Sequence, residues 1–234
     1  PTYQTSINLD GYINIGSGTP NFFPPQQILN TYKKSIDDYK LTYTSWSGLD
    51  DLKVAASNKL KRENNYYADP YSEILITSGA QSAILASLMA ILNIDDEVIL
   101  TAPYYRTYEE MAVICGAKIV PIITNYESNY TLDVNVVEEK ITKNTKAIIL
   151  VSPSNPTGTV LKKEIIQDIY KLSVKHDVVL FTDEIYEHYI FDDNSHYSIN
   201  SDYPEKNNVI SIYSLSKGYG LTGIRVGYIV SNEN

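Results

Sequence analysis

The sequence contains one cysteine, Cys115, in 234 residues, and it has no long uninterrupted apolar run. A single cysteine can form neither an internal disulfide nor a site of several thiolates, which fits a reducing compartment. Roughly 18 consecutive apolar residues are needed to indicate a membrane span, so we expect no membrane partner. The opening residues also lack the basic start and apolar centre of a signal peptide. These absences predict a cytoplasmic protein.

Basic residues are also scarce: 19 Lys and Arg stand against 28 Asp and Glu, which gives a formal net charge of −9. A nucleic-acid-binding protein needs clustered positive charge, so we expect no nucleic-acid partner. The three histidines share no ligand spacing, and we expect no metal site. The hydrophobic fraction of 43% is that of a globular protein rather than a disordered one.

From residue 73 onward, short apolar runs alternate with helical patterns, which is typical of an α/β fold with a mostly parallel sheet. Seven strands are predicted, at residues 73–78, 97–101, 118–123, 146–152, 178–183, 209–214 and 225–230. Helices are predicted between the first five strands, at residues 80–92, 105–115, 133–140 and 163–176. We therefore expect a three-layer α/β/α fold around a seven-stranded, mostly parallel sheet.

Residues 1–72 have a different character, with a Pro- and Gly-rich opening followed by helical stretches around 26–38 and 50–63. We interpret them as an arm and helices that pack on the core, and residues 73–234 as the large domain. The span 184–208 is predicted to be a loop with short elements. The sequence stops shortly after the last predicted strand, with no closing helix. Because an α/β sheet needs cover on both faces, we expect one face to be uncovered.

The strongest local signal is SLSKGYGLTGIRVGY at residues 214–228, which contains Lys217. This lysine follows a predicted strand and lies among small residues, so its amine can face a cleft. Desolvation and a neighbouring cation lower a lysine pKa and make the amine a nucleophile toward carbonyl groups. The alternative is a surface lysine in a glycine-rich turn, and the lysine alone does not decide between them.

The same stretch matches a dinucleotide-binding fingerprint through Gly218, Gly220 and Gly223. That fingerprint must open a helix, and an acidic residue must follow about 20 residues later. Here the next residues, IRVGYIV, predict another strand. We therefore reject a dinucleotide-dependent dehydrogenase.

Three further motifs follow other predicted strands. Gly79, Ala80 and Gln81 open a helix, where free N–H groups and the helix dipole can bind a phosphate, although an ordinary helix start is the alternative. Asn155 begins an Asn-Pro-Thr-Gly sequence that can also be a simple β-turn. Asp183 ends the fifth strand, where a carboxylate faces the ligand crevice of an α/β sheet or caps the next segment.

Taken together, these motifs resemble the large domain of the fold-type I pyridoxal-phosphate enzymes, in the class I/II aminotransferase group. The resemblance runs from GSGTPNF at residues 16–22 to the Lys217 stretch. It implies the PLP-dependent transferase fold, pyridoxal 5′-phosphate as the cofactor, and transfer of an amino group between an α-amino acid and a 2-oxo acid. In this family a C-terminal small domain carries the arginine that binds the substrate carboxylate. We expect that domain to be absent from this chain, which would leave the chain incomplete for catalysis.

The resemblance also implies a role for each matching residue. Lys217 would form the Schiff base with the cofactor and then move a proton, and Asp183 would pair with the pyridine nitrogen. Asn155 and Tyr186 would bind the phenolic oxygen, while Tyr105 would stack on the ring, so that Lys217, Asp183 and Tyr105 form the catalytic set. The phosphate would be held by Gly79, Ala80, Gln81, Ser214, Ser216 and Arg225.

Two matches concern the substrate and a second subunit. Gly18 matches the arm glycine that lies against the substrate, and Asn155 is assigned to the substrate as well. Tyr43 resembles the tyrosine that reaches the phosphate of the partner subunit, which implies a homodimer. Three alternative functions stay open: a PLP-dependent carbon–sulfur lyase, an aminocyclopropane-carboxylate-synthase-like enzyme, and a non-catalytic cofactor-sensing domain.

Overall fold

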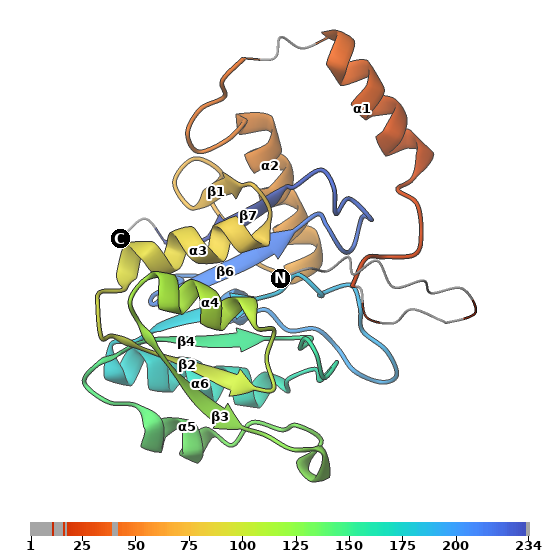
Figure 1. Cartoon of the computed structure of the whole chain (residues 1–234). Coiled ribbons are helices and arrows are strands. Elements are labelled where there is room, and N and C mark those ends of the chain that lie inside the picture. The colour runs from red at the N-terminus through yellow and green to blue at the C-terminus, as the bar shows by residue number, and fades with distance from the viewer. Residues whose placement is uncertain (1–10, 12–15, 17, 39–41, 233–234) are drawn as a thin grey trace.

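The computed structural model describes residues 11, 16, 18–38 and 42–232 of the chain (Figure 1). The α-helices are α1 (Gln26–Asp38), α2 (Asp50–Lys59), α3 (Ala80–Ile91), α4 (Thr107–Ile114), α5 (Val134–Lys140) and α6 (Lys163–His176). The strands are β1 (Ile74–Thr77), β2 (Glu97–Ala102), β3 (Lys118–Ile123), β4 (Thr145–Val151), β5 (Val179–Asp183), β6 (Val209–Ser214) and β7 (Gly227–Val230). Within the described ranges, no helix combines the length and the apolar character needed to cross a membrane.

The seven strands form one sheet in the order β1-β7-β6-β5-β4-β2-β3. Strands β2 to β6 run parallel to one another, whereas β7 is antiparallel to both β1 and β6. The expected seven-stranded, mostly parallel sheet is therefore confirmed. Because β1 and β6 both oppose β7, they point the same way, and the carboxyl ends of all strands except β7 lie at one edge of the sheet.

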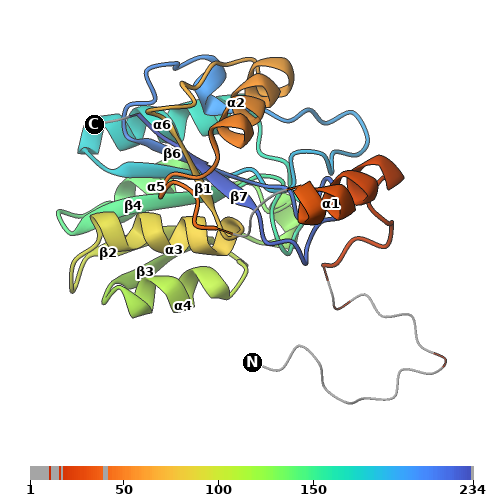
Figure 2. The same cartoon turned by 90° about the horizontal axis from the view of Figure 1, so that it is seen from above.

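Helices cover both faces of the sheet (Figure 2). One core lies under α3 and α4 and includes Leu88, Ile149 and Phe181. The opposite core lies under α5 and α6 and includes Ile148 and Ile169. Neighbouring residues of β4 belong to different cores because successive side chains of a strand point to opposite faces. The expectation of an uncovered face is wrong.

The two N-terminal helices differ in how they pack. Leu60, which follows α2, is fully buried in a third core with Tyr213 and Tyr228, at the β6–β7 end of the sheet. Helix α1 has no buried residue and stands apart from the sheet (Figure 1). We expected the N-terminal helices to pack on the core, and this expectation is wrong for α1. The third core covers the sheet near β7.

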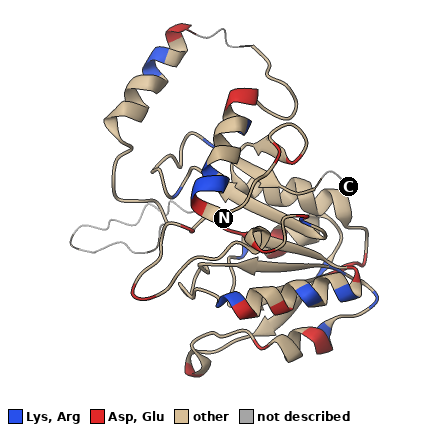
Figure 3. Ribbon diagram, turned by 180° about the vertical axis from the view of Figure 1, so that it is seen from behind, with Lys and Arg blue, Asp and Glu red and all other residues tan. Residues whose placement is uncertain are grey.

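The element boundaries differ from the predicted ones at two informative places. The last strand begins at Gly227 rather than at Arg225, because Arg225 has a left-handed backbone with φ of 62°. The predicted helix over 50–63 continues beyond α2 as a π-helix, η1 (Leu60–Asn64). The span after β5 contains one short 3₁₀-helix, η3 (Ile199–Ser201), within the described residues. On α6, lysines are interspersed with Asp and Glu rather than forming a basic surface (Figure 3).

Candidate active site

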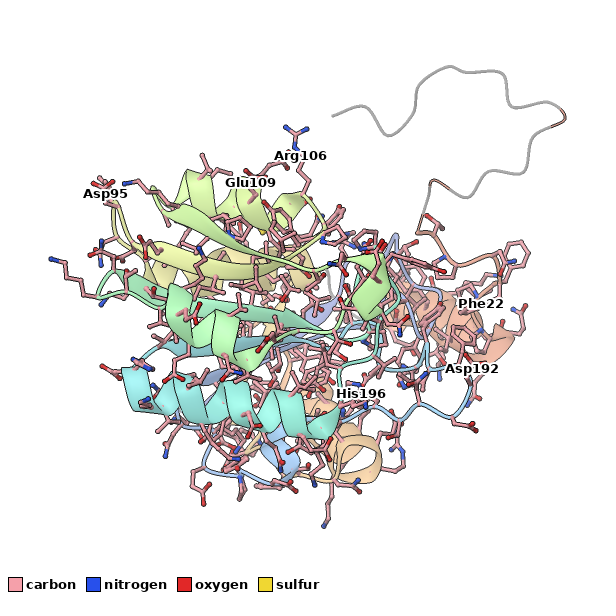
Figure 4. All side chains as sticks on the ribbon, turned by 90° about the horizontal axis from the view of Figure 1, so that it is seen from below. Phe22, Asp95, Arg106, Glu109, Asp192 and His196 are labelled. Atoms are coloured by element: carbon pink, nitrogen blue, oxygen red, sulfur yellow. The ribbon has the colours of Figure 1, made fainter. Side chains whose placement is uncertain are left out.

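The predicted site residues gather at the carboxyl edge of the sheet. Asn155 follows β4, Asp183 ends β5 and Lys217 follows β6, and these three strands are parallel neighbours. Gly79 follows β1, which points the same way as β6. Figure 4 shows Asp95, which precedes β2, at one end of the sheet, and His196, from the loop after β5, toward the other end. In open α/β sheets, ligands bind at this carboxyl edge.

Asp183 is a buried carboxylate held by two donors. Its exposed fraction is 2%. The Tyr108 hydroxyl donates a hydrogen bond of 2.6 Å to Oδ2, and the backbone N–H of Ile185 donates one of 3.1 Å to Oδ1. Burial raises the pKa of Asp183 to about 6, and the two hydrogen bonds oppose that rise. At neutral pH this side chain is predominantly an anion within an apolar core.

Lys217 lies half-buried in the loop between β6 and β7. Its Nζ donates a hydrogen bond of 2.6 Å to the carbonyl oxygen of Gly18 and lies 5.7 Å from the ring centre of Tyr186. Its own carbonyl accepts a hydrogen bond of 3.1 Å from the Tyr189 hydroxyl. Burial lowers the pKa of the amine, and the nearby charge of Arg225 lowers it further. Both effects increase the fraction of neutral, nucleophilic amine.

Two side-chain pairs line the space around Lys217 and Asp183. The Asn155 amide donates a hydrogen bond of 3.4 Å to the Tyr186 hydroxyl, joining the loop after β4 to the segment after β5. The Gln81 amide donates one of 3.2 Å to the Tyr105 hydroxyl, joining α3 to the segment before α4. Both pairs consist of residues that the sequence assigned to the cofactor.

A group suited to binding an anion lies at the first turn of α3. Gly79 precedes the helix with φ of 83°, and no side chain caps the helix start. The Arg225 guanidinium lies against Gly79 so closely that an added Cβ would be 2.8 Å from Cζ. Arg225 also donates a hydrogen bond of 3.4 Å to the Ser216 hydroxyl. Unpaired N–H groups of a first helical turn and a guanidinium are the usual donors to phosphate.

The other predicted residues differ in how closely they join this group. The Ser214 hydroxyl accepts a hydrogen bond of 3.1 Å from the N–H of Ser216, and Ala80 is the buried first residue of α3. The Tyr43 side chain is fully exposed, and among the described residues no hydrogen bond or ring contact joins it to the rest. Gly18 and Gln81 are also exposed. The site is therefore open to solvent on one side in a single copy of the chain.

A shallow hollow opens beside this group, at the carboxyl ends of β2 and β4. Asn155 is the predicted site residue that lines this hollow. Tyr104 and Thr157, which were not predicted for the site, line it as well. The hollow and the group around Lys217 are therefore neighbours that share one side chain.

Tyr108 and Tyr189 were not among the predicted site residues, although their hydroxyls donate hydrogen bonds to Asp183 and to the carbonyl of Lys217. Tyr108 follows Tyr105 by three residues, a spacing that brings side chains together at the start of a helix. Their rings are 6.1 Å apart and nearly perpendicular. The spacing was visible in the sequence, but the contact between Tyr108 and Asp183, which are 75 residues apart, was not.

Behind Asp183 lies one group of possible metal ligands within the described residues, formed by Glu184, Glu187 and His196. Neighbouring side chains already bind these three residues. His196 donates to Glu184 at 2.8 Å, and the remaining donors to the two carboxylates are Lys59, Asn64, Ser198 and Thr182. The group is thus a buried ion-pair network that ties α2 and η1 to the segment after β5.

Comparisons with known proteins agree on one family. The family profile described as "Aminotransferase class I and II" matches residues 10–234. The chain is 36% identical to the aspartate aminotransferase of Pyrococcus abyssi, covering 98% of this chain and 59% of that protein. It is 32% identical to aromatic-amino-acid aminotransferase 2 of Thermococcus litoralis, covering 99% of this chain and 59% of that protein. The chain spans about three fifths of the length of these relatives.

Solved structures give the same result. The aromatic aminotransferase of Pyrococcus horikoshii OT3 superposes with a TM-score of 0.90 at 36% identity, covering 93% of this chain and 58% of that one. The aspartate aminotransferase of Thermus thermophilus with maleate superposes with a TM-score of 0.88 at 33% identity, covering 93% and 56%. The expected PLP-dependent transferase fold is confirmed.

Class I and II aminotransferases use pyridoxal 5′-phosphate, and the residues present fit this cofactor. The close approach of Arg225 to Gly79 provides phosphate donors at a helix start. Asp183 supplies a buried carboxylate, and Lys217 supplies an amine of lowered pKa. With a family profile matched over nearly its whole length, the chain belongs to the class I and II aminotransferases.

Proposed function

We propose that the protein is a pyridoxal-phosphate-dependent aminotransferase that moves an amino group between an α-amino acid and a 2-oxo acid. The observation that carries the proposal is the convergence of Lys217, Asp183 and Arg225 at one edge of the sheet, in a chain of this family. An amine, a buried carboxylate and a phosphate-binding guanidinium are the three charged groups that this chemistry requires.

Bound pyridoxal phosphate supplies an aldehyde and a ring that accepts electrons. Lys217 would be the nucleophile toward the aldehyde, and the same amine would accept and donate the proton at the substrate Cα. Its lowered pKa keeps part of the amine neutral for both tasks. Asp183 holds a proton on the ring nitrogen, which requires its carboxylate to be ionised. Its pKa of about 6 satisfies this requirement at neutral pH.

The remaining residues orient the cofactor. Asn155 and Tyr186 are joined by their own hydrogen bond and would bind the phenolic oxygen of the ring. Tyr105 packs on the ring face, as aromatic side chains do. The phosphate is bound by N–H groups, hydroxyls and a guanidinium from Gly79, Ala80, Gln81, Ser214, Ser216 and Arg225.

We propose a homodimer as the working form. Helix α1 carries the exposed apolar side chains Tyr32 and Ile36, and Trp46 in the following segment is 88% exposed. Clustered exposed apolar side chains mark interaction surfaces. The open side of the site, with Gly18 and Arg225 exposed, would be closed by a second copy, and Tyr43 is free to reach it.

Reduction with borohydride in the presence of pyridoxal phosphate tests the role of Lys217. We expect mass spectrometry of the digested protein to locate a pyridoxyl group on Lys217, and we expect no such peptide from Lys217→Ala. Lys53, a buried lysine that pairs with Asp50, is an internal control that should stay unmodified. An unmodified Lys217 in a protein that binds the cofactor would contradict the assignment.

A second experiment separates amino-group transfer from lyase chemistry. Relatives named for aspartate and for aromatic amino acids make these the first donors to test, each with a 2-oxo acid acceptor. Transfer requires the acceptor and converts it to an amino acid in equal amount to the donor consumed. Donor breakdown that continues without any acceptor would favour the lyase alternative.

A further inference from the structure

Neutral hydrogen-bond donors, rather than positive charges, stabilise the ionised carboxylate of Asp183. Among the described residues, no ammonium or guanidinium group lies within ion-pair distance of its carboxylate. The charged group that acts on it is Glu184, whose negative charge opposes ionisation. The two hydrogen bonds, from Tyr108 and from the N–H of Ile185, are therefore what offsets burial.

The Tyr108 hydrogen bond is the shorter of the two and comes from a different element. Its 2.6 Å length is typical of a hydroxyl that donates to a charged carboxylate. Tyr108 is 3% exposed and belongs to the core under α3 and α4, so its ring has little freedom to move. The hydroxyl binds Oδ2 and the Ile185 N–H binds Oδ1, so each carboxylate oxygen is fixed by one donor and keeps a lone pair for another.

The same helix start also positions the predicted ring-stacking residue. Tyr105 and Tyr108 contact each other edge to face, and the Tyr105 hydroxyl accepts a hydrogen bond from Gln81. The segment that begins α4 therefore orients both an aromatic ring for the cofactor face and a hydroxyl for the carboxylate that faces the cofactor nitrogen.

We propose that Tyr108 is a positioning residue that acts through Asp183, with its hydroxyl fixing the carboxylate and holding it ionised toward the ring nitrogen of pyridoxal phosphate. This inference rests on the proposed function for the identity of the group that Asp183 faces. The hydrogen bond between Tyr108 and Asp183 stands independently of it.

The test is a ¹³C NMR titration of Asp183 in the cofactor-free protein. The Asp183→Asn variant assigns the carboxyl signal. In Tyr108→Phe, which keeps the ring and removes the hydroxyl, we expect the titration midpoint to rise by about one pH unit, because the ionised carboxylate loses one of its two hydrogen-bond donors. The matched control is Tyr170→Phe, a buried tyrosine on α6 on the opposite face of the sheet. An unchanged midpoint in folded Tyr108→Phe would overturn the proposal.

A second variant covers the case in which Tyr108→Phe does not fold. Incorporation of 3-fluorotyrosine at position 108 keeps the side chain and makes the hydroxyl a stronger donor. The midpoint should then fall below that of the wild type, which is the opposite direction from Tyr108→Phe. No displacement of the midpoint with this residue would overturn the proposal as well.

Cofactor affinity connects the hydrogen bond to the proposed function. If the cofactor binds the ionised carboxylate, the dissociation constant for pyridoxal phosphate in Tyr108→Phe should exceed that of the wild type by about tenfold at pH 5 and approach it above pH 8. A pH-independent difference would indicate a merely structural role and would contradict the proposal. Failure of the proposed function is distinguishable, since it would leave Lys217 unlabelled while the Asp183 midpoint still moved.

Discussion

The amine of Lys217 donates a hydrogen bond to the carbonyl oxygen of Gly18, a residue 199 positions earlier in the chain. This contact places the N-terminal arm over the amine. An added Cβ at Gly18 would lie 3.3 Å from Nζ and 3.8 Å from the Tyr186 hydroxyl, so the arm approaches the amine as closely as a glycine allows. A backbone carbonyl accepts a hydrogen bond from a neutral or a charged amine, and the contact therefore orients Lys217 without fixing its charge.

The charge of Lys217 should respond to Arg225. Burial lowers the pKa of the amine most, and Arg225 lowers it further, so the change Arg225→Gln should raise the pKa. Labelling by pyridoxal, which lacks the phosphate, followed by borohydride, should therefore need a higher pH in this variant. Affinity for pyridoxal phosphate should fall by about 10- to 100-fold, the value of a hydrogen bond to a charged group.

The matched control for Arg225→Gln is Arg62→Gln, which removes an exposed guanidinium that pairs with Glu63 on η1. Both the labelling midpoint and the cofactor affinity should match the wild type in this control. An Arg225→Gln protein with an unchanged labelling midpoint would show that Arg225 does not act on the amine.

Replacement of Gly79 by alanine should weaken cofactor binding through Arg225. The new Cβ would collide with the guanidinium, and the backbone φ of 83° is unfavourable for alanine by about 1–3 kcal/mol. Gly116→Ala provides a matched strain control, with φ of 80° and a new Cβ that meets Ile94 outside the site. Urea unfolding should show destabilisation of both variants, whereas titration with pyridoxal phosphate should show weaker binding in Gly79→Ala alone. Equal affinities would remove Gly79 from the phosphate site.

Strong periodic patterns made much of the fold predictable. The sequence predicted α6 and β3 to the residue, because α6 is strongly amphipathic and β3 is a short segment rich in Ile and Val. The predicted start of β7 was wrong. The strand-like pattern of IRVGYIV includes Arg225, but the left-handed backbone of Arg225 breaks the strand there. The sequence pattern of α1 predicted a helix correctly. Such a pattern indicates that the apolar face of the helix packs against something, but it does not identify the partner surface.

The family resemblance, together with positions at the ends of parallel strands such as those of Asn155, Asp183 and Lys217, predicted residues that the fold gathers at one edge of the sheet. The contacts within the site could not be predicted. The donor to Asp183 comes from a helix on another part of the chain, and its tyrosine belongs to an ordinary core pattern. The network of Glu184 and His196 was hidden for the same reason, because two acids and a histidine in a loop carry no periodic signal.

The buried pair of His196 and Glu184 should make stability depend on pH. Burial of His196 lowers its pKa, but the hydrogen bond and charge of Glu184 outweigh burial, so the pKa is raised overall above the ordinary value of 6.5. A histidine whose pKa is higher in the folded state stabilises the fold below its unfolded pKa, and the contribution is lost as the pH rises through the folded pKa. The loss in unfolding free energy caused by His196→Gln should therefore be larger at pH 5.5 than at pH 9.

Urea unfolding of both proteins at the two pH values measures this difference. The raised pKa of Asp183 also makes stability fall as the pH rises, in the same direction as His196, but this contribution is present in both proteins and cancels when the variant is compared with the wild type. His188→Gln is the control, because His188 pairs with Glu63 at a more exposed position. A His196→Gln penalty that is equal at both pH values would mean that the histidine is neutral in the folded protein.

The homodimer predicts a role for Tyr43 that a single copy of the chain cannot provide. Its side chain is fully exposed, so Tyr43→Phe should leave folding and the mass in sedimentation unchanged. If its hydroxyl binds the phosphate in the partner subunit, affinity for pyridoxal phosphate should fall by about tenfold. Tyr71→Phe, at a position that is 68% exposed, should have no such effect. If Tyr43→Phe forms a dimer that binds the cofactor like the wild type, Tyr43 does not have this role. If the wild-type protein is a monomer with full affinity for the cofactor, the binding site is not shared between two subunits.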